Sequence, residues 1–164
     1  MKVITINSPV DLQMEDLDRI LSIFDEISQY ENDLKSAEAI TDELHIYQPF
    51  LLSILMGYKF DLSPEELGEA LTLYIAIWEY FKIDSRVKSR KITDTQFERL
   101  HNNNMQLLVK NDPANMEDVA ILFNVIVERF MKRPVLSGMG TKSKAALMIG
   151  TKSIIECFQE LTIE

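Results

Sequence analysis

The stretch SPEELGEALTLYIAIWEYF, residues 63–81, decides the fold class of this chain. Ser63 and Glu66 have the spacing of a capping box, and Pro64 suits the first helical position, so a helix begins here. One apolar stripe follows at helical spacing: Leu67, Leu71, Tyr74, Trp78 and Phe81. Further apolar residues between them make the helix apolar most of the way round: Leu73, Ile75 and Ile77. We therefore expect this helix either at the centre of a bundle or at an interface between two copies.

The same spacing of apolar residues continues through nearly all of the chain. Further helices are expected from Pro9 onward, over 41–57 with a kink at Pro49 and a C-cap at Gly57, from Thr93 to Leu108, from Asn115 to about Pro134, and over 141–161. Residues 30–41 either continue the first helix or turn into the second, and residues 1–8 form an arm or a short strand. Residues 137–140 are expected to be a loop. The prediction is an all-α fold: one domain, residues 1–164, built as a bundle of about six helices.

Composition indicates a globular protein of a reducing compartment. The chain has 46% hydrophobic and 26% charged residues, and its one cysteine, Cys157, leaves no internal disulfide framework. The N-terminal residues lack the pattern of a secretory signal, and the longest apolar stretch, Pro49–Tyr58, is about half the length of a membrane span. We therefore expect a soluble cytoplasmic protein with no membrane partner.

The net charge of −9 is unevenly distributed. Residues 1–81 hold 16 acidic and 4 basic side chains, whereas residues 82–164 hold 10 acidic and 13 basic ones. An acidic protein repels phosphates at long range, which disfavours nucleic-acid binding. The basic connection 82–91 precedes a helix whose outer face is rich in Gln and Asn, so we read this connection as a solvated loop.

A carboxylate-bridged metal site is one candidate for chemistry. Asp42-x-x-His45 and Glu98-x-x-His101 have the spacing of di-iron bundles, and two glutamates on other helices, Glu79 and Glu128, could complete the set. At about 100° per residue, however, both glutamates and Glu98 point away from the apolar stripes of their helices. We therefore predict no metal site and no cofactor.

A catalytic nucleophile is also not indicated. Cys157 lies on the flank of an apolar stripe, where a packed and inert thiol is the usual case. The chain contains neither a G-x-S-x-G elbow nor an H-E-x-x-H motif. The sequence thus favours a protein that is not an enzyme, without deciding the question.

The stretch from Arg129 to Ile155 contains six basic side chains and not one acidic one. Lys142 and Lys144 would stand in the first turn of the last helix, where the helix dipole disfavours positive charge. Gly138 and Gly140 leave the backbone free to expose its amides, and Thr141 and Ser143 add hydroxyl groups, so these residues suggest an anion-binding turn. Its candidate residues are Arg133, Gly138, Gly140, Thr141, Lys142, Ser143 and Lys144. The alternative is a basic loop neutralised by the acidic N-terminal half.

Two functions from different classes remain open. The preferred hypothesis is a non-catalytic module that binds or regulates another protein through charge complementarity and an apolar helix face. The alternative is a binder of a phosphate-containing small ligand, or an enzyme acting on one, at the turn Gly138–Lys144. A homodimer is also expected, because the helix over 63–81 has so wide an apolar arc.

Overall fold

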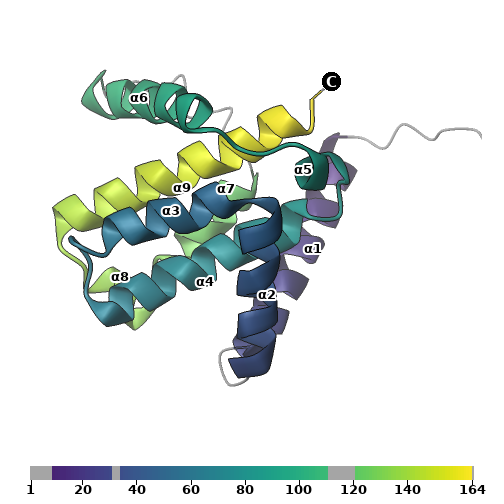
Figure 1. The fold of residues 1–164 in the computed structure, drawn as a ribbon, viewed down its shortest axis with the longest axis horizontal. Helices are drawn as coiled ribbons and strands as arrows, with labels where there is room; N and C mark the ends of the chain where they lie inside the picture. The colour runs from purple at the N-terminus through teal and green to yellow at the C-terminus, as the bar shows by residue number, and fades with distance from the viewer. Residues whose placement is uncertain (1–8, 31–33, 111–120, 164) are drawn as a thin grey trace, which may run out of the picture.

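The computed structural model of the chain describes residues 9–30, 34–110 and 121–163. Within these ranges it contains nine α-helices and one π-helical turn and no strand, so the predicted all-α class is confirmed (Figure 1). The elements are α1 Pro9–Tyr30, α2 Leu34–Tyr47, α3 Pro49–Tyr58, α4 Pro64–Phe81, α5 Arg86–Ser89, α6 Asp94–Lys110, α7 Ile121–Val125, the π-helix η2 Ile126–Phe130, α8 Pro134–Ser137 and α9 Thr141–Leu161. The predicted arm 1–8 and the Asn115 helix start lie outside the described residues.

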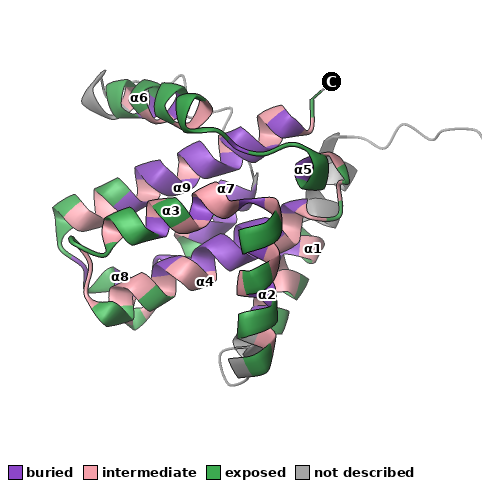
Figure 2. Cartoon of the chain, viewed as in Figure 1, coloured by how far each residue is buried: buried purple, intermediate pink, exposed green. Residues whose placement is uncertain are grey.

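Helix α4 is the central helix of the bundle. Its predicted capping box is present: the Glu66 amide donates to Ser63 Oγ at 3.2 Å, and the Ser63 amide donates to Glu66 Oε1 at 2.9 Å. Helices α1, α2, α3, α8 and α9 pack around it, and its C-terminal half is almost wholly buried (Figure 2). The wide apolar arc of α4 is therefore covered within one copy of the chain.

Helix α9 lies beside α4 and begins and ends where the sequence predicts. Its predicted inward face is buried in full: Leu147, Thr151, Ile154, Phe158 and Leu161. The Phe158 ring stacks on Phe81 with ring centres 4.9 Å apart and meets Trp78 at 6.1 Å. These aromatic contacts between α4 and α9 form the middle of the core.

The expected single helix over 41–57 is wrong: it is two helices, α2 and α3, separated at Gln48. Pro49 has no amide hydrogen and starts a new helix at its first position, while Gln48 has non-helical backbone angles, φ −138° and ψ 64°. The buried Gln48 side chain donates to the carbonyls of Val87 and Arg90 at 2.7 and 2.8 Å and accepts from the Ile92 amide at 3.0 Å. This break thus anchors the 86–92 connection.

The ends of these two helices also differ from the prediction. Helix α2 begins at Leu34, so most of the ambiguous stretch 30–41 belongs to the second helix. Helix α3 continues through Gly57 to Tyr58, and Lys59 at its end keeps right-handed helical backbone angles. Gly57 is therefore not a C-cap, because the chain leaves α3 without a left-handed residue.

The region before α9 is more irregular than expected. The helix containing α7 widens into the π-helix η2, where the Met131 amide bonds the Ile126 carbonyl at 3.1 Å. The extra residue in this turn lets Phe130 and Met131 both be buried. Pro134, expected to end a helix, instead begins α8, and Ser137 belongs to α8 rather than to a loop.

No helix within residues 9–30, 34–110 and 121–163 combines the length and the apolar character needed to cross a membrane.

Candidate functional site

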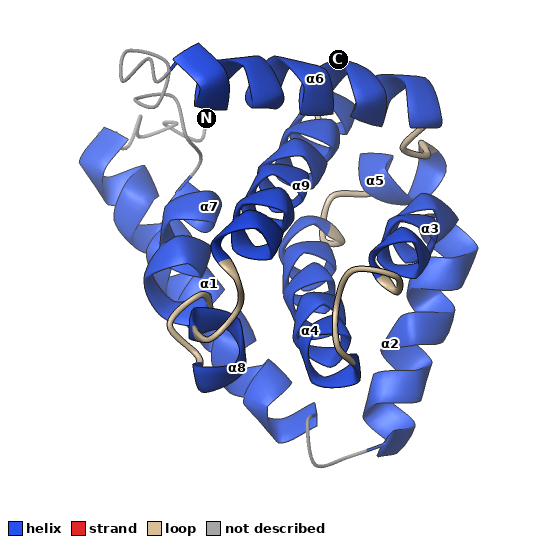
Figure 3. Cartoon of the chain, turned by 90° about the vertical axis from the view of Figure 1, so that its left-hand side faces the viewer, coloured by secondary structure: helices blue, strands red, loops and turns tan. Residues whose placement is uncertain are grey.

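Six of the seven predicted anion-site residues form one turn, the α8–α9 turn: Gly138, Gly140, Thr141, Lys142, Ser143 and Lys144. Figure 3 views the end of the bundle that carries this turn. Gly138 and Gly140 have φ values of −82° and −59°, which residues other than glycine also adopt. Gly140 is the N-cap of α9 and supplies no side-chain hydrogen bond to its first amides, and a Cβ there would meet nothing within 4 Å. The start of α9 is thus open to solvent.

The charges at this turn divide into two kinds. Arg133 is engaged within the fold, because its Nε lies 2.9 Å from Glu69 Oε2 and its guanidinium lies 5.0 Å from the Phe130 ring centre. Lys142 is exposed and Lys144 is half-buried, and neither forms an ion pair with any residue that the structure describes. The acidic N-terminal half therefore neutralises Arg133 but not these two lysines.

The basic connection 82–91 serves the fold. Lys82 Nζ lies 2.8 Å from Glu79 Oε1 and 3.6 Å from Glu43 Oε1, so it joins α4 to α2. Arg90 donates to the carbonyls of Leu161 and Ile163 at 3.1 and 3.0 Å and so satisfies the free carbonyls at the end of α9.

Two further cations of this connection have partners nearby. Arg86 forms a bidentate pair with Asp84, and Lys88 lies 5.3 Å from the centre of the Tyr47 ring. Hydrogen bonds from the Arg86 side chain and from the Arg86 backbone amide lower the pKa of Asp84 to about 2. The basic residues that prompted the nucleic-acid alternative are thus largely used to hold elements together.

The six candidate metal ligands do not converge. Asp42, His45, Glu98 and Glu128 are exposed and lie on three different elements, the first two on α2 and the others on α6 and η2. His101 packs beside the Phe97 ring, with ring centres 5.3 Å apart. Among the described residues, no three His, Cys, Asp or Glu side chains are close enough to share a metal ion.

Glu79 differs from its predicted place. Its side chain is only 8% exposed, because α2 and Lys82 cover the side of α4 that the apolar pattern assigned to solvent. Lys82 donates to its carboxylate at 2.8 Å. A second carboxylate, Glu43, accepts a hydrogen bond from Trp78 Nε1 at 3.0 Å in the same cluster. This cluster is an ion-paired joint between α2 and α4.

Cys157 is buried, as its position on α9 predicts. Burial, followed by the negative charges of Glu160 and Glu156, raises the pKa of its thiol to about 12. A thiol of this kind holds almost no nucleophilic thiolate near neutral pH.

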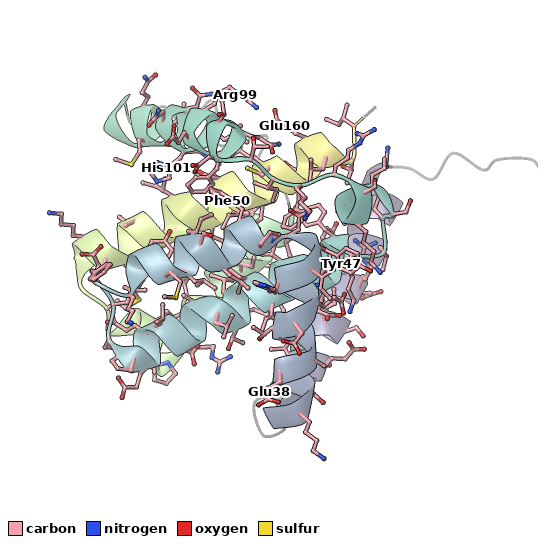
Figure 4. All side chains as sticks on the ribbon, viewed as in Figure 1. Glu38, Tyr47, Phe50, Arg99, His101 and Glu160 are labelled. Carbon is pink, nitrogen blue, oxygen red and sulfur yellow. The ribbon has the colours of Figure 1, made fainter. Side chains whose placement is uncertain are left out.

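Among the described residues, the clearest charge without an ion-pair partner lies on helices α1 and α2, residues 9–30 and 34–47, which we call the acidic hairpin. These two helices hold 9 acidic and 2 basic side chains, so their net charge is −7. Figure 1 shows α1 and α2 extending from the body of the bundle, and Glu38 marks the far part of α2 in Figure 4. Five of its carboxylates are exposed and form no ion pair with any described residue: Asp18, Asp25, Glu26, Glu38 and Asp42.

The sequence shows this charge as an asymmetry between its two halves but does not place it on a surface. The spacing on α2 does indicate a surface, because Glu38, Asp42 and Ile46 recur every four residues and so share one helical face. Ile46 on this face is 62% exposed, an unusual value for an isoleucine.

Comparison of the chain with models of protein families, with curated proteins and with solved structures found no match.

Proposed function

We propose that this domain is a protein-binding module that takes a basic partner on the acidic hairpin. The observation that carries the proposal is the set of five exposed carboxylates on α1 and α2 that form no ion pair with any residue the structure describes. In the rest of the described chain, by contrast, many carboxylates are paired with cations: Glu69, Glu79, Asp84, Glu128, Glu156 and Glu160. Charge that the fold does not use is available to another molecule.

The exposed face of α2 offers both kinds of contact that an interface needs. Glu38 and Asp42 provide negative charge at its outer part, and Ile46 provides an apolar side chain one turn further on. Protein interfaces commonly combine a few apolar anchors with a polar rim that excludes water. A basic helix or extended basic segment with one apolar residue matches this face.

The electric field of the acidic hairpin attracts a basic partner before the two molecules touch. A surface of one charge sign raises the local concentration of an oppositely charged partner and speeds association, and salt screens this effect. The proposed binding is therefore strong at low ionic strength and weakens as salt is added.

A binding titration tests the proposal directly. A fluorescent lysine-rich peptide with a single leucine serves as the probe, and its anisotropy is measured with the full chain. Replacing Glu38 and Asp42 together with Lys is expected to weaken binding by about tenfold or more, because attraction at the contact face becomes repulsion.

The matched control changes the net charge equally at other exposed sites. Glu98→Lys together with Glu128→Lys alters α6 and η2 and leaves the hairpin intact. This control is expected to bind the peptide within about twofold of the unchanged chain, after allowance for the weaker overall field. An equal loss of affinity in both double variants would show that binding depends only on net charge, and would contradict a docking face on α2.

The α8–α9 turn supports a second candidate function, the binding of a phosphate-containing ligand. The observation in its favour is that Lys142 and Lys144 have no ion-pair partner among the described residues, in a helical turn that disfavours them. A bound phosphate would supply the missing negative charge.

Thermal shift measurements separate this candidate from the first. Inorganic phosphate and ATP should raise the melting temperature of the unchanged chain if the turn binds phosphate. Replacing Lys142 and Lys144 with Glu should abolish that rise and leave the protein folded, with the helix dipole favouring the new charges. An identical response in both proteins would exclude the turn as the site.

A further inference from the structure

Helix α6 packs against the bundle almost entirely through α9, and the contact is largely polar. Among the side chains of α6 whose exposure is described, only Leu100 and Asn104 are buried. Helix α9, in contrast, buries ten residues. We call the contact between α6 and the C-terminal half of α9 the α6–α9 seam.

The middle of the seam is a hydrogen-bonded network around Asn104. Asn104 Nδ2 donates to Ser153 Oγ at 3.0 Å and to Glu156 Oε1 at 2.8 Å. Lys152 Nζ donates to Asn104 Oδ1 and to Glu156 Oε1, both at 2.7 Å. These four side chains therefore satisfy one another with little apolar surface between them.

Near the N-terminus of α6, the seam is a charged contact with Glu160 of α9. Arg99 Nη2 lies 2.8 Å from Glu160 Oε2 (Figure 4), and Gln96 Nε2 donates to Glu160 Oε1 at 3.1 Å. The Arg99 and Glu160 side chains are 52% and 37% exposed, so water and salt reach this pair. Exposed pairs of this kind contribute little to stability, because water and salt screen them.

Among the described side chains of α6, apolar contacts are few. Leu100 is the only buried apolar one, and the Phe97 ring meets the Phe50 ring of α3 edge-on with centres 5.5 Å apart. Because hydrophobic burial dominates stability and a hydrogen bond exchanged with water contributes little, these contacts hold α6 far less firmly than the buried residues of α4 hold that helix.

The face of α9 beneath α6 is itself partly polar. It carries Ser153, Glu156 and Glu160 with Cys157 on its flank, whereas the opposite face of α9 carries the aromatic core. Exposing the first face therefore costs less free energy than exposing the second.

We infer that α6 is a releasable helix, which detaches from α9 as a unit while α1–α4 and α9 remain packed, and which covers Cys157 in its docked state. The release is a sub-global opening of low free energy, of the kind that elements with few buried apolar contacts undergo. Salt promotes it by screening the Arg99–Glu160 pair. The inference does not depend on the acidic hairpin.

Cys157 is a built-in reporter of this opening. It is the only cysteine in the chain, it is fully buried, and Gln96 of α6 donates to its backbone carbonyl at 3.2 Å. Reaction with a disulfide reagent requires the thiolate, which burial suppresses in the docked state. The rate of labelling by 5,5′-dithiobis(2-nitrobenzoate) at a fixed pH therefore follows the population of the open state.

The test compares three full-length proteins: the unchanged chain, Arg99→Gln and Arg133→Gln. Arg99→Gln removes the ion pair between α6 and α9, and we expect it to speed labelling by about two- to fivefold with little change in the midpoint of global unfolding. Arg133→Gln removes the pair that Arg133, just before α8, forms with Glu69 of α4, far from the seam. Its labelling rate should stay within about twofold of that of the unchanged chain.

The unchanged chain provides an independent measurement. At low denaturant, its labelling rate should depend only weakly on denaturant concentration, because releasing α6 exposes much less surface than unfolding. The rate should also rise with added salt. Labelling that follows the steep denaturant dependence of global unfolding, with no effect of salt or of Arg99→Gln, would overturn the inference.

Discussion

At the scale of single residues, Gly150 shows how one missing side chain fixes the packing of two helices. A Cβ at this position would collide with the hydroxyl of Tyr58, which comes from the end of α3. The Tyr74 hydroxyl would lie 3.7 Å from the same Cβ, so the partly buried phenol of Tyr58 and the buried phenol of Tyr74 both meet the backbone of α9 here. Burial raises the pKa of both phenols, so they stay neutral well into the alkaline range. Ala146, four residues earlier on α9, is exposed, so the close approach is at Gly150.

Gly150→Ala is therefore expected to destabilise the protein by about 1–3 kcal/mol, the usual cost of overpacking a core. Tyr58→Phe removes the colliding oxygen and leaves the nearest ring carbon at 3.4 Å, so the cost of Gly150→Ala should be smaller in the Tyr58→Phe background. Urea denaturation of the two single variants and the double variant measures this coupling.

Gly68→Ala provides the matched control. Gly68 is exposed within α4, and a Cβ there would meet nothing within 4 Å. The same substitution should therefore stabilise the chain, by up to about 1 kcal/mol, because alanine is the better helix former. A loss of stability at Gly68 equal to that at Gly150 would show that the cost of Gly150→Ala does not come from the Tyr58 contact.

At the scale of elements, the sequence predicted helices wherever local signals suffice. The capping box and proline at Ser63–Glu66 placed the start of α4, and the apolar stripe of α9 identified its buried face. The break at Gln48 was missed because its three partners lie 39 to 44 residues away in the chain. The burial of Glu79 was missed for the same reason, since Lys82 and α2 are brought to it only by the fold.

The α6–α9 seam leads to a pH prediction. Burial alone would raise the pKa of Glu160, but hydrogen bonds from Gln96 and Arg99, with the charge of Arg99, lower it below its usual value. On α9 itself, Glu156 and Cys157 are its ionisable neighbours. A carboxylate whose pKa is lowered by folding stabilises the docked state above its unfolded pKa of about 4.5 and loses that effect as pH falls through the lowered value.

We therefore expect acid to release α6 before the core unfolds. Amide signals of α6 in NMR spectra should change at a higher pH than those of α4, and the carboxyl of Glu160 should titrate below the usual range. In Arg99→Gln this titration should move up toward the ordinary value, because the main cation is gone. An unchanged titration of Glu160 in that variant would show that Arg99 has no part in docking α6.

At the scale of the whole molecule, the fold separates two kinds of charge. Arg133 and the cations of the 82–91 connection are largely used to join helices, whereas most of the described negative charge of the acidic hairpin is left to solvent. The sequence showed the imbalance but could not separate used from unused charge, because pairing depends on which helices meet. Self-association remains a prediction, and since α4 is covered within one copy it would need a different surface.

The most direct test of the central claim is an NMR titration of the full chain with the lysine-rich peptide. Saturable shift changes should concentrate on the exposed residues of the hairpin, foremost Glu38, Asp42 and Ile46 on α2, and should weaken as salt is added. Substitution of Glu38 and Asp42 by Lys should remove them. Shift changes spread evenly over exposed carboxylates such as Glu98 and Glu128, or centred on another element, would contradict the assignment of the hairpin as the binding surface.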